Sequence, residues 1–262
     1  MTSGTQLIDR AVAVMDVVAA SGASGAQLKD IALESGLNTA TCHRVLTSLV
    51  SHGLLSRDAA RRYVLGNKLM VLGARASNGP GLRGLCAPTL DRLRQHSGET
   101  AVLMLRNAGM SVCVDRREGD IAFRTLTGSI GGAVPLGVGP GSLAMLAFLP
   151  AEEVATLIQA NAARYAEFER LSPAKVLNLV NETQRQGFAL DMGELIDGVG
   201  GMAIPVRSPA GSPVASLGLT FLATPANAAR LPSFEALLRA EASSIEAQLS
   251  PFDLPSDNGL PR

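Results

Sequence analysis

A short stretch near the amino terminus, NTATCHRVLTSLVSHG at residues 38–53, decides the fold. Its apolar residues recur three or four positions apart and form one stripe of a helix, made of Cys42, Val45, Leu46, Leu49 and Val50. The opposite face is short, polar and free of acidic residues, as a helix must be to approach base edges and phosphates. Asn38 or Thr39 can cap the first turn, and Gly53 can end the helix.

Two further helices are predicted before this one. Apolar residues at helical spacing predict an amphipathic helix over residues 5–20, which the small residues at 21–25 end. A shorter helix is expected at about 27–35, and Gly36 can take the left-handed conformation that often closes a helix. The order helix, turn, helix is therefore predicted up to residue 53.

A basic hairpin is predicted next. Two short strands, at 54–57 and 62–65, flank the turn at 58–61. The hairpin carries three arginines, whose guanidinium groups can pair with phosphates along the DNA backbone or in the minor groove. Together these elements predict a winged helix-turn-helix that binds DNA. The alternatives are that the same geometry binds a protein and that the arginines only solvate a turn.

The charges are unevenly distributed, although 23 Lys/Arg balance 23 Asp/Glu over the 262 residues. Residues 1–78 hold eight basic against five acidic residues, a net charge of +3, and residues 79–262 have a net charge of −3. This is expected if only the first part meets a polyanion, although statistical scatter can give the same difference.

Composition excludes several classes of protein. With 47% hydrophobic residues the chain is not disordered, and its three cysteines make no disulfide framework but suit the cytosol. The uncharged stretch 125–151 contains six glycines and three prolines, which would break a membrane-spanning helix. The three histidines offer no catalytic or metal-binding arrangement. We expect no enzymatic activity, cofactor, metal or membrane partner.

The remainder of the chain is predicted to alternate strands with helices. Strands are expected at 100–106, 111–117, 121–126, 201–207 and 213–221, and helices at about 82–96, 142–149, 152–161, 173–186 and 233–249. Meandering strands with segregated helices indicate an α+β domain. The run Asp115-Arg-Arg-Glu118 is expected to be a charged strand end or an interface.

A glycine-rich loop, VPLGVGPGS at residues 134–142, opens the helix expected at 142. Free backbone amides and the positive end of the helix would suit a carboxylate. The alternative is that the glycines only permit tight turns. This is no dinucleotide fingerprint, because the third glycine and the surrounding strand-helix-strand unit are missing.

Motifs run through nearly the whole chain. The first half holds Leu28-Lys-Asp-Ile-Ala32, Thr41-Cys-His-Arg44, His52-Gly-Leu-Leu55 and Arg62-Tyr-Val-Leu-Gly66, and the second holds Ser97-Gly-Glu-Thr100, Leu146-Ala-Phe-Leu-Pro150, Arg185-Gln-Gly-Phe-Ala-Leu-Asp191 and Met202-Ala-Ile-Pro-Val206. By these motifs the chain resembles the IclR family of bacterial transcriptional regulators. Four parts are expected: a winged helix-turn-helix domain at 1–66, a linker helix at 67–81, an effector-binding domain at 82–250 and a flexible tail at 251–262. The effector domain would have a GAF/PAS-like antiparallel sheet with a ligand pocket on one side.

The resemblance also implies site residues. DNA binding falls to Thr39, Ala40, Thr41, His43 and Arg44, with the hairpin residues Arg57, Arg61 and Arg62 beside them. Effector binding falls to Gly139, Gly141, Ser142, Met145, Asp191, Gly201, Gly218 and Thr220.

The pocket departs from the family pattern. Many members have a His where this chain has Gly137, and glyoxylate-sensing relatives have a Cys and two small hydroxyls where it has Gly201, Gly218 and Thr220. Asp191 is retained, although such an Asp often only caps a turn. A roomier, more apolar cavity is therefore expected, to which Met104, Met145 and Met202 could adapt.

The expected effector is a small organic acid larger than glyoxylate, aromatic acids included. The protein would be a homodimer or homotetramer that binds a double-stranded operator under control of this effector. A DNA-binding regulator controlled only by a protein partner is the alternative. Repression and activation both remain open.

Overall fold

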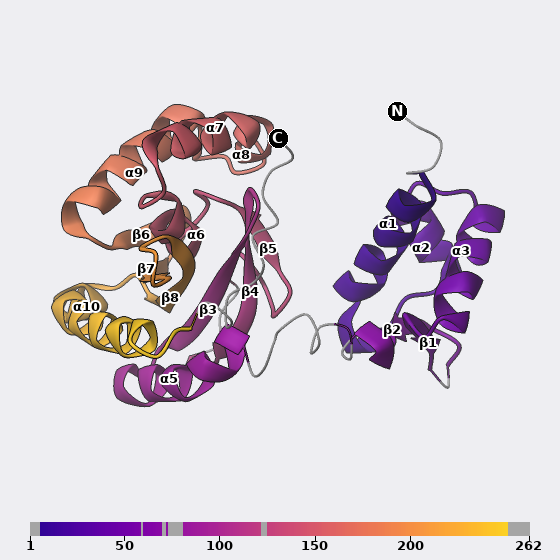
Figure 1. Cartoon of the computed structure of the whole chain (residues 1–262), viewed down its shortest axis with the longest axis horizontal. Coiled ribbons are helices and arrows are strands. Elements are labelled where there is room, and N and C mark those ends of the chain that lie inside the picture. Colours follow the sequence, from indigo (N-terminus) through magenta and orange to yellow (C-terminus); the bar gives the residue numbers. More distant parts are fainter. Residues whose placement is uncertain (1–5, 59, 70–71, 73–80, 122–124, 251–262) are drawn as a thin grey trace. The chain divides into compact units, whose positions relative to one another are not determined.

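The computed structural model describes residues 6–58, 60–69, 72, 81–121 and 125–250. The chain divides into two compact units, Met1–Gly79 and Pro80–Arg262, each of which is described by itself (Figure 1). The division falls inside the segment 67–81, where the linker is expected. Residues 67–69 and 72 are helical, while the rest of the predicted linker helix and the predicted tail at 251–262 lie outside the described residues.

The first unit consists of three helices, a 3-10 turn and a hairpin. Its elements are α1 (Gln6–Ala20), η1 (Gly22–Ser24), α2 (Leu28–Glu34), α3 (Thr39–Ser51), β1 (Leu55–Arg57) and β2 (Tyr63–Leu65). The helices enclose a core of apolar residues from all three helices and both strands, among them Val14, Ile31, Leu46, Leu55 and Tyr63. The predicted winged helix-turn-helix is confirmed, and its element boundaries differ by at most one residue from those expected.

Local chemistry fixes the turns of this unit. Asn38, not Thr39, is the N-cap of α3, and its side chain accepts a hydrogen bond of 2.8 Å from the Thr41 amide. Gly36 and Gly53 both have positive φ, at 66° and 72°, so the chain can reverse after α2 and after α3. The amide of Ala26 donates to the Tyr63 carbonyl at 2.9 Å and ties the start of the helix-turn-helix to the hairpin.

The second unit is built on one six-stranded antiparallel sheet of order β5-β4-β3-β8-β7-β6. Its strands are β3 (Thr100–Asn107), β4 (Met110–Arg117), β5 (Ala133–Pro135), β6 (Ala189–Ile196), β7 (Val199–Arg207) and β8 (Pro213–Leu222). Its helices are α5 (Gly81–Ser97), α6 (Pro140–Leu146), α7 (Ala151–Ala160), α8 (Ala162–Tyr165), α9 (Pro173–Gln186) and α10 (Pro225–Glu246). The predicted α+β class is confirmed.

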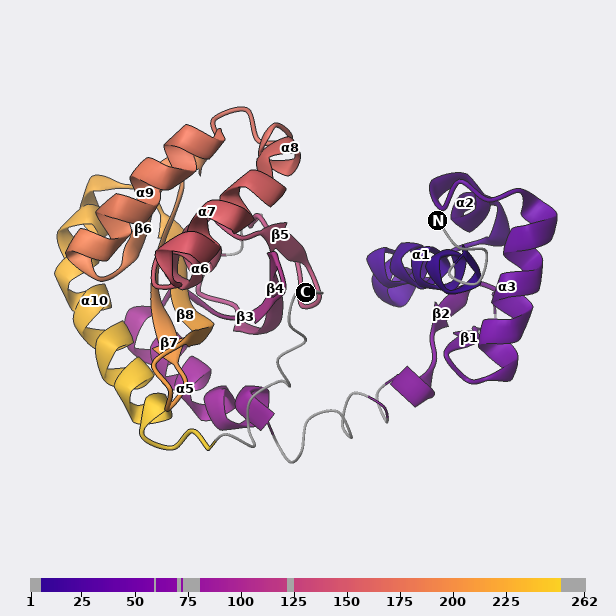
Figure 2. The same ribbon diagram turned by 45° about the horizontal axis from the view of Figure 1, so that its top comes forward.

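Helices cover both faces of the curled sheet (Figures 1 and 2). On one face α5 and α10 pack over a core that includes Leu90, Leu103, Phe221 and Phe234. On the other face α6, α7 and α9 enclose a second core around Leu136, Met145, Leu146, Tyr165 and Val176. Within the part of the chain that the structure describes, no helix is long and apolar enough to cross a membrane.

Several predicted elements of the second unit are wrong. Ile121, Thr125 and Leu126 lie outside any strand, while 122–124 fall outside the described residues. The segment instead makes turns, in which the amides of Gly128 and Ser129 donate to the carbonyls of Thr125 and Thr127. The third strand of this part is β5, which was not predicted.

The last helix begins at Pro225 and not at 233, because the hydroxyl of Thr224 caps it and Pro225 suits its first turn. Strand β6 and the short helix α8 were not predicted either. In β6 the alternation of apolar residues is interrupted by Gly193 and Glu194, which conceals the period of a strand.

Candidate functional sites

The exposed face of α3 brings together the helix residues predicted to bind DNA. Thr39, Ala40, His43 and Arg44 are exposed and Thr41 is partly buried, whereas the stripe Cys42, Val45, Leu46 and Leu49 is buried on the opposite side. The helix contains no acidic residue, and the positive end of its dipole lies at Thr39. The face is therefore open to an anionic ligand and electrostatically suited to one.

The three hairpin arginines differ in what they contact. The guanidinium of Arg57 lies 4.7 Å from the centre of the Tyr63 ring, and that of Arg62 pairs with Asp58 at 3.0 Å. Hydrogen bonds from Arg62, first of all from its backbone amide, lower the pKa of Asp58. Arg61 has a positive φ of 62° and is exposed. Among the described residues, neither Arg44 nor Arg61 has an acidic partner for its side chain.

The second unit contains a cavity of about 90 Å³ between the sheet and the loop that precedes α6. Its walls are the segment 125–127, strands β3, β5, β6, β7 and β8, and residues 138–142, which we call the loop although its last three residues form the first turn of α6. The lining is Val102, Met104, Thr125, Leu126, Thr127, Val134, Val138, Gly139, Pro140, Gly141, Ser142, Asp191, Leu195, Ile196, Val199, Gly200, Gly201, Met202, Ala203, Gly218, Leu219 and Thr220. Such a volume holds several water-sized groups.

Most residues predicted to bind the effector lie around this cavity. Those that line it are Gly139, Gly141, Ser142, Asp191, Gly201, Gly218 and Thr220. Met145 is the exception: one helical turn beyond Ser142, its side chain is fully buried in the core beneath α6 and does not line the cavity. Met104 and Met202, expected as adaptable walls, are both in the lining.

The glycines bring the loop close to the sheet. A Cβ atom at Gly141 would lie 2.9 Å from Met104 Cγ, and one at Gly139, where φ is 79°, would lie 2.7 Å from Leu126 Cδ1. A Cβ atom at Gly201 would lie 3.1 Å from Cγ of Pro140. Pro140 thus fills part of the space that the missing side chain of Gly201 leaves. This glycine allows close packing, and it enlarges the cavity less than we expected from the sequence.

Two buried serines hold the loop in place. Ser142 Oγ donates to the Val138 carbonyl at 2.7 Å and accepts from the Gly137 amide at 3.1 Å, so its hydroxyl is engaged within the loop. Ser216 Oγ donates to the Gly141 carbonyl at 2.7 Å and attaches the loop to β8. Sequence reasoning missed Ser216, because its partner is 75 residues away in the chain.

Asp191 is the one ionisable side chain among the described lining residues. Its carboxylate accepts from the amides of Gly193, Glu194 and Leu195 at 3.2, 2.7 and 3.4 Å, which is the turn-capping role considered for it. Burial raises its pKa, and these amide hydrogen bonds partly oppose the rise. Asp191 can therefore accept a hydrogen bond from a ligand and, when protonated, can donate one.

Thr125 and Thr127 also line the cavity, although the sequence did not mark them. Thr125 lies in the segment 121–126, which was predicted to be a strand, and Thr127 follows it directly. A segment of turns after β4 can reach over the cavity, whereas a further strand would have lain in the sheet. The two hydroxyls add polar groups to an otherwise largely apolar wall.

Comparison with known proteins connects both sites to one family. Two family models match: "IclR helix-turn-helix domain" at residues 7–59 and "Bacterial transcriptional regulator IclR C-terminal" at residues 76–247. A glycerol operon regulatory protein of Streptomyces griseus is 31% identical over 84% of this chain and 86% of its own length. The HTH-type transcriptional regulator XynR of Escherichia coli is 26% identical over 89% of this chain and 93% of its own length.

Solved structures share the fold. An IclR homolog of Microbacterium hydrocarbonoxydans, complexed with 4-hydroxybenzoate, has a TM-score of 0.76 at 24% identity and covers 93% of this chain and 98% of its own. An IclR transcriptional regulator of Alicyclobacillus acidocaldarius also has a TM-score of 0.76, at 23% identity, with 92% and 98% covered.

Proposed function

The chain belongs to the IclR family of bacterial transcriptional regulators, and on this premise we propose that it binds a double-stranded operator through α3 and the hairpin, and that a small organic acid in the cavity modulates this binding. It is a transcription regulator with an effector-binding domain and not an enzyme. The observation that carries the proposal is the pairing of an exposed, acid-free helix face in one unit with a largely apolar cavity in the other.

DNA recognition would follow from the placement of α3. A recognition helix enters the major groove with its amino-terminal residues near the base edges. Thr39, Ala40, Thr41, His43 and Arg44 occupy this end of α3 and its exposed face. Arg44 can bind a guanine edge bidentately or pair with a phosphate.

The hairpin would contact the DNA backbone. Arg61 is exposed and can reach a phosphate or the minor groove directly. Arg57 stacks on Tyr63 and Arg62 pairs with Asp58, so these two would contact phosphate through the donors that remain free. We expect Arg61 to contribute most of the affinity of the hairpin for DNA.

The cavity favours an acid with a large apolar part. Its aliphatic walls suit a ring or a short hydrocarbon, and Thr125, Thr127, Thr220 and Asp191 supply the polar contacts. A carboxylate ligand beside Asp191 would raise the pKa of Asp191 further, because two like charges in a buried site repel each other. An acid would thus bind best with a proton held between the two groups, and its affinity would fall as pH rises.

Control of DNA binding requires a homo-oligomer. Paired units would read half-sites separated by one helical turn of DNA or a multiple of it. An effector can shift the balance between arrangements with matching and mismatched spacing only if it binds them with unequal affinity. We propose a homodimer or homotetramer of this kind, which acts in the cytoplasm, where its DNA is.

Two experiments test the proposal. The full chain is used to select binding sequences from random duplex DNA, and we expect a palindromic or directly repeated site. The Tm of the chain is then measured in the presence of each of a panel of organic acids that includes 4-hydroxybenzoate. An acid that binds the folded chain should raise the Tm, since a ligand at 100 times its Kd adds about 2.7 kcal/mol to the free energy of unfolding. If no DNA sequence is enriched, the proposed DNA-binding role is contradicted. A selected operator without any stabilising acid would favour control by a protein partner.

A further inference from the structure

The end of β4 is placed by an irregularity in the sheet. Leu103 of β3 pairs with Asp115, but the next residue, Met104, pairs with Cys113, so that Val114 is an extra residue in β4. Such a bulge reverses which face of the sheet the following residues occupy. Arg116 consequently lies opposite Val102, which lines the cavity, and Arg117 lies opposite Ala101, in the core beneath α5.

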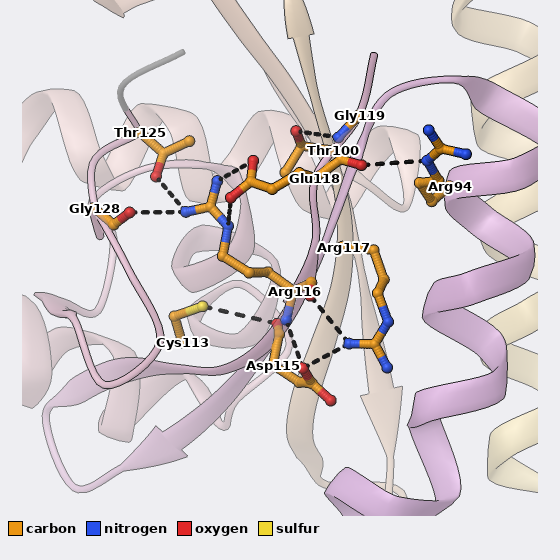
Figure 3. A network of polar contacts seen from close by, with 10 residues as sticks. All are labelled: Arg94, Thr100, Cys113, Asp115, Arg116, Arg117, Glu118, Gly119, Thr125 and Gly128. Atoms are coloured by element: carbon orange, nitrogen blue, oxygen red, sulfur yellow. Dashed lines mark hydrogen bonds and ion pairs between the residues drawn. The ribbon is translucent and has the colours of Figure 1, made fainter. Parts of the chain in front are cut away.

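On the cavity side, Arg116 holds the wall. Its side chain is only 9% exposed. Its Nη1 donates to the Gly128 carbonyl at 2.9 Å and to Thr125 Oγ1 at 3.3 Å, and its Nε and Nη2 both lie 3.0 Å from the carboxylate oxygens of Glu118. Figure 3 shows the guanidinium directed at Thr125 and Gly128. Arg116 thus fixes the segment that supplies Thr125, Leu126 and Thr127 to the cavity.

On the other side, the same strand holds α5. Arg117 Nε donates to Asp91 at 2.6 Å and its Nη1 donates to Asp115 at 2.8 Å. The buried carboxylate of Asp115 also lies 3.6 Å from Nε of Arg83. Figure 3 shows Arg117 directed away from Arg116, toward the opposite side of the strand. Arg83 and Asp91 are two helical turns apart, so β4 is attached to α5 at two points.

We propose that Arg116 is a positioning residue for the cavity and that Asp115–Glu118 couples the cavity wall to α5, the helix with which the described part of the second unit begins. Thr125 connects the cavity to this link, because it lines the cavity and its hydroxyl accepts a hydrogen bond from Arg116. A ligand group that donates a hydrogen bond to this hydroxyl oxygen competes with Arg116, and the change reaches Arg117 and Asp115 through one short strand segment. The biological use of the link rests on the proposed function, but the link itself does not.

The test is amide hydrogen exchange on the full chain, without DNA or ligand. In Arg116→Gln we expect faster exchange in residues 125–133 and also in α5, by about fivefold or more. Arg117→Gln should act in the reverse direction, with faster exchange in α5 and also in 125–133. Arg239→Gln is the matched control: it removes an ion pair with Glu235 on α10 and a hydrogen bond to the Gln186 carbonyl, both away from β4, and should leave both segments unchanged.

Two further measurements separate coupling from general destabilisation. Exchange in β7 and β8 is the internal reference, because global unfolding would raise it as well. If Arg116→Gln unfolds, Arg116→Lys replaces it, since it retains the charge while losing the forked geometry. In Arg116→Ala, whose short side chain leaves room, added ethylguanidinium should restore protection at residues 125–133, and in Arg117→Ala it should not restore protection there.

The proposal is overturned if either variant changes exchange only on its own side of β4, or if neither changes it relative to β7 and β8. Failure of the chain to select an operator or to bind an acid would alter none of these rates. The link and the proposed function can therefore fail separately.

Discussion

The bond between Ser216 and Gly141 yields a prediction whose size follows from the structure. Ser216 is fully buried on β8, and its hydroxyl donates to the Gly141 carbonyl, in the first turn of α6, at 2.7 Å. Ser216→Ala keeps the Cβ atom and removes only this donor. The Gly141 carbonyl, at the edge of the cavity, then loses a partner that water cannot easily replace.

The expected cost is that of losing one buried hydrogen bond to a carbonyl, about 1 kcal/mol. In a domain of this size 1 kcal/mol corresponds to about 2–4 °C in Tm, so the second unit should melt about 2–4 °C lower. The same change should weaken the binding of any ligand that contacts the loop, because the loop is no longer held against β8.

The composition of the chain provides the assay. It has two tyrosines and no tryptophan, and Tyr63 lies in the first unit while Tyr165 lies in the second. In a Tyr63→Phe background, tyrosine fluorescence during urea unfolding therefore reports the second unit alone. The control is Ser233→Ala on α10, where an exposed hydroxyl donates to the Arg230 carbonyl. It should change stability by no more than about 0.5 kcal/mol. A Ser216→Ala effect as small as this would refute the role assigned to the bond.

Three other predictions concern single groups. Asn38→Ala should destabilise the first unit by about 1 kcal/mol, read from Tyr63 fluorescence in a Tyr165→Phe background, because α3 loses its N-cap; an unchanged midpoint would contradict the cap. Because the folded pKa of Asp191 is raised, its ionisation weakens the fold: stability should fall as pH rises from about 3.9 through the folded pKa, and urea unfolding of Asp191→Asn should lack this loss. An equal slope in both proteins would exclude Asp191 as its source. The buried thiols Cys42, Cys86 and Cys113 should resist a disulfide reagent at neutral pH until the chain unfolds, since burial raises the pKa of each, that of Cys86 to about 12; rapid labelling of the native protein would contradict their burial.

Local signals made the first unit predictable from the sequence. Each turn there depends on a residue next to it: Asn38 caps α3, and Gly36 and Gly53 take the positive φ values that end α2 and α3. The cavity residues could be assigned only through the family resemblance, because their chemistry arises from contacts between distant segments. The pairing of Ser216 with Gly141 leaves no trace in local patterning.

The positions of several side chains in the second unit could not be predicted from the sequence, and each has a physical reason. A bulge at Val114 reverses the alternation along β4, so counting residues would have put Arg116 on the wrong face. The missing side chain at Gly201 suggested open space, whereas Pro140 occupies part of it. Met145 lies one helical turn after Ser142, a spacing that suits a residue of the cavity wall, but its side chain is buried in the core. In each case the position of the side chain depends on strand pairing or on packing between elements that are distant in the sequence.

The affinity of the full chain for its selected operator, measured for Arg44→Ala against Arg239→Ala, tests the central claim most directly. Arg44 lies exposed on the acid-free face of α3, and Arg239 on α10 is paired with Glu235. We predict that Arg44→Ala weakens binding at physiological salt by about 1–3 kcal/mol while Arg239→Ala binds as the wild type does. Equal operator affinity for the two variants would contradict the assignment of α3 as the DNA-reading helix.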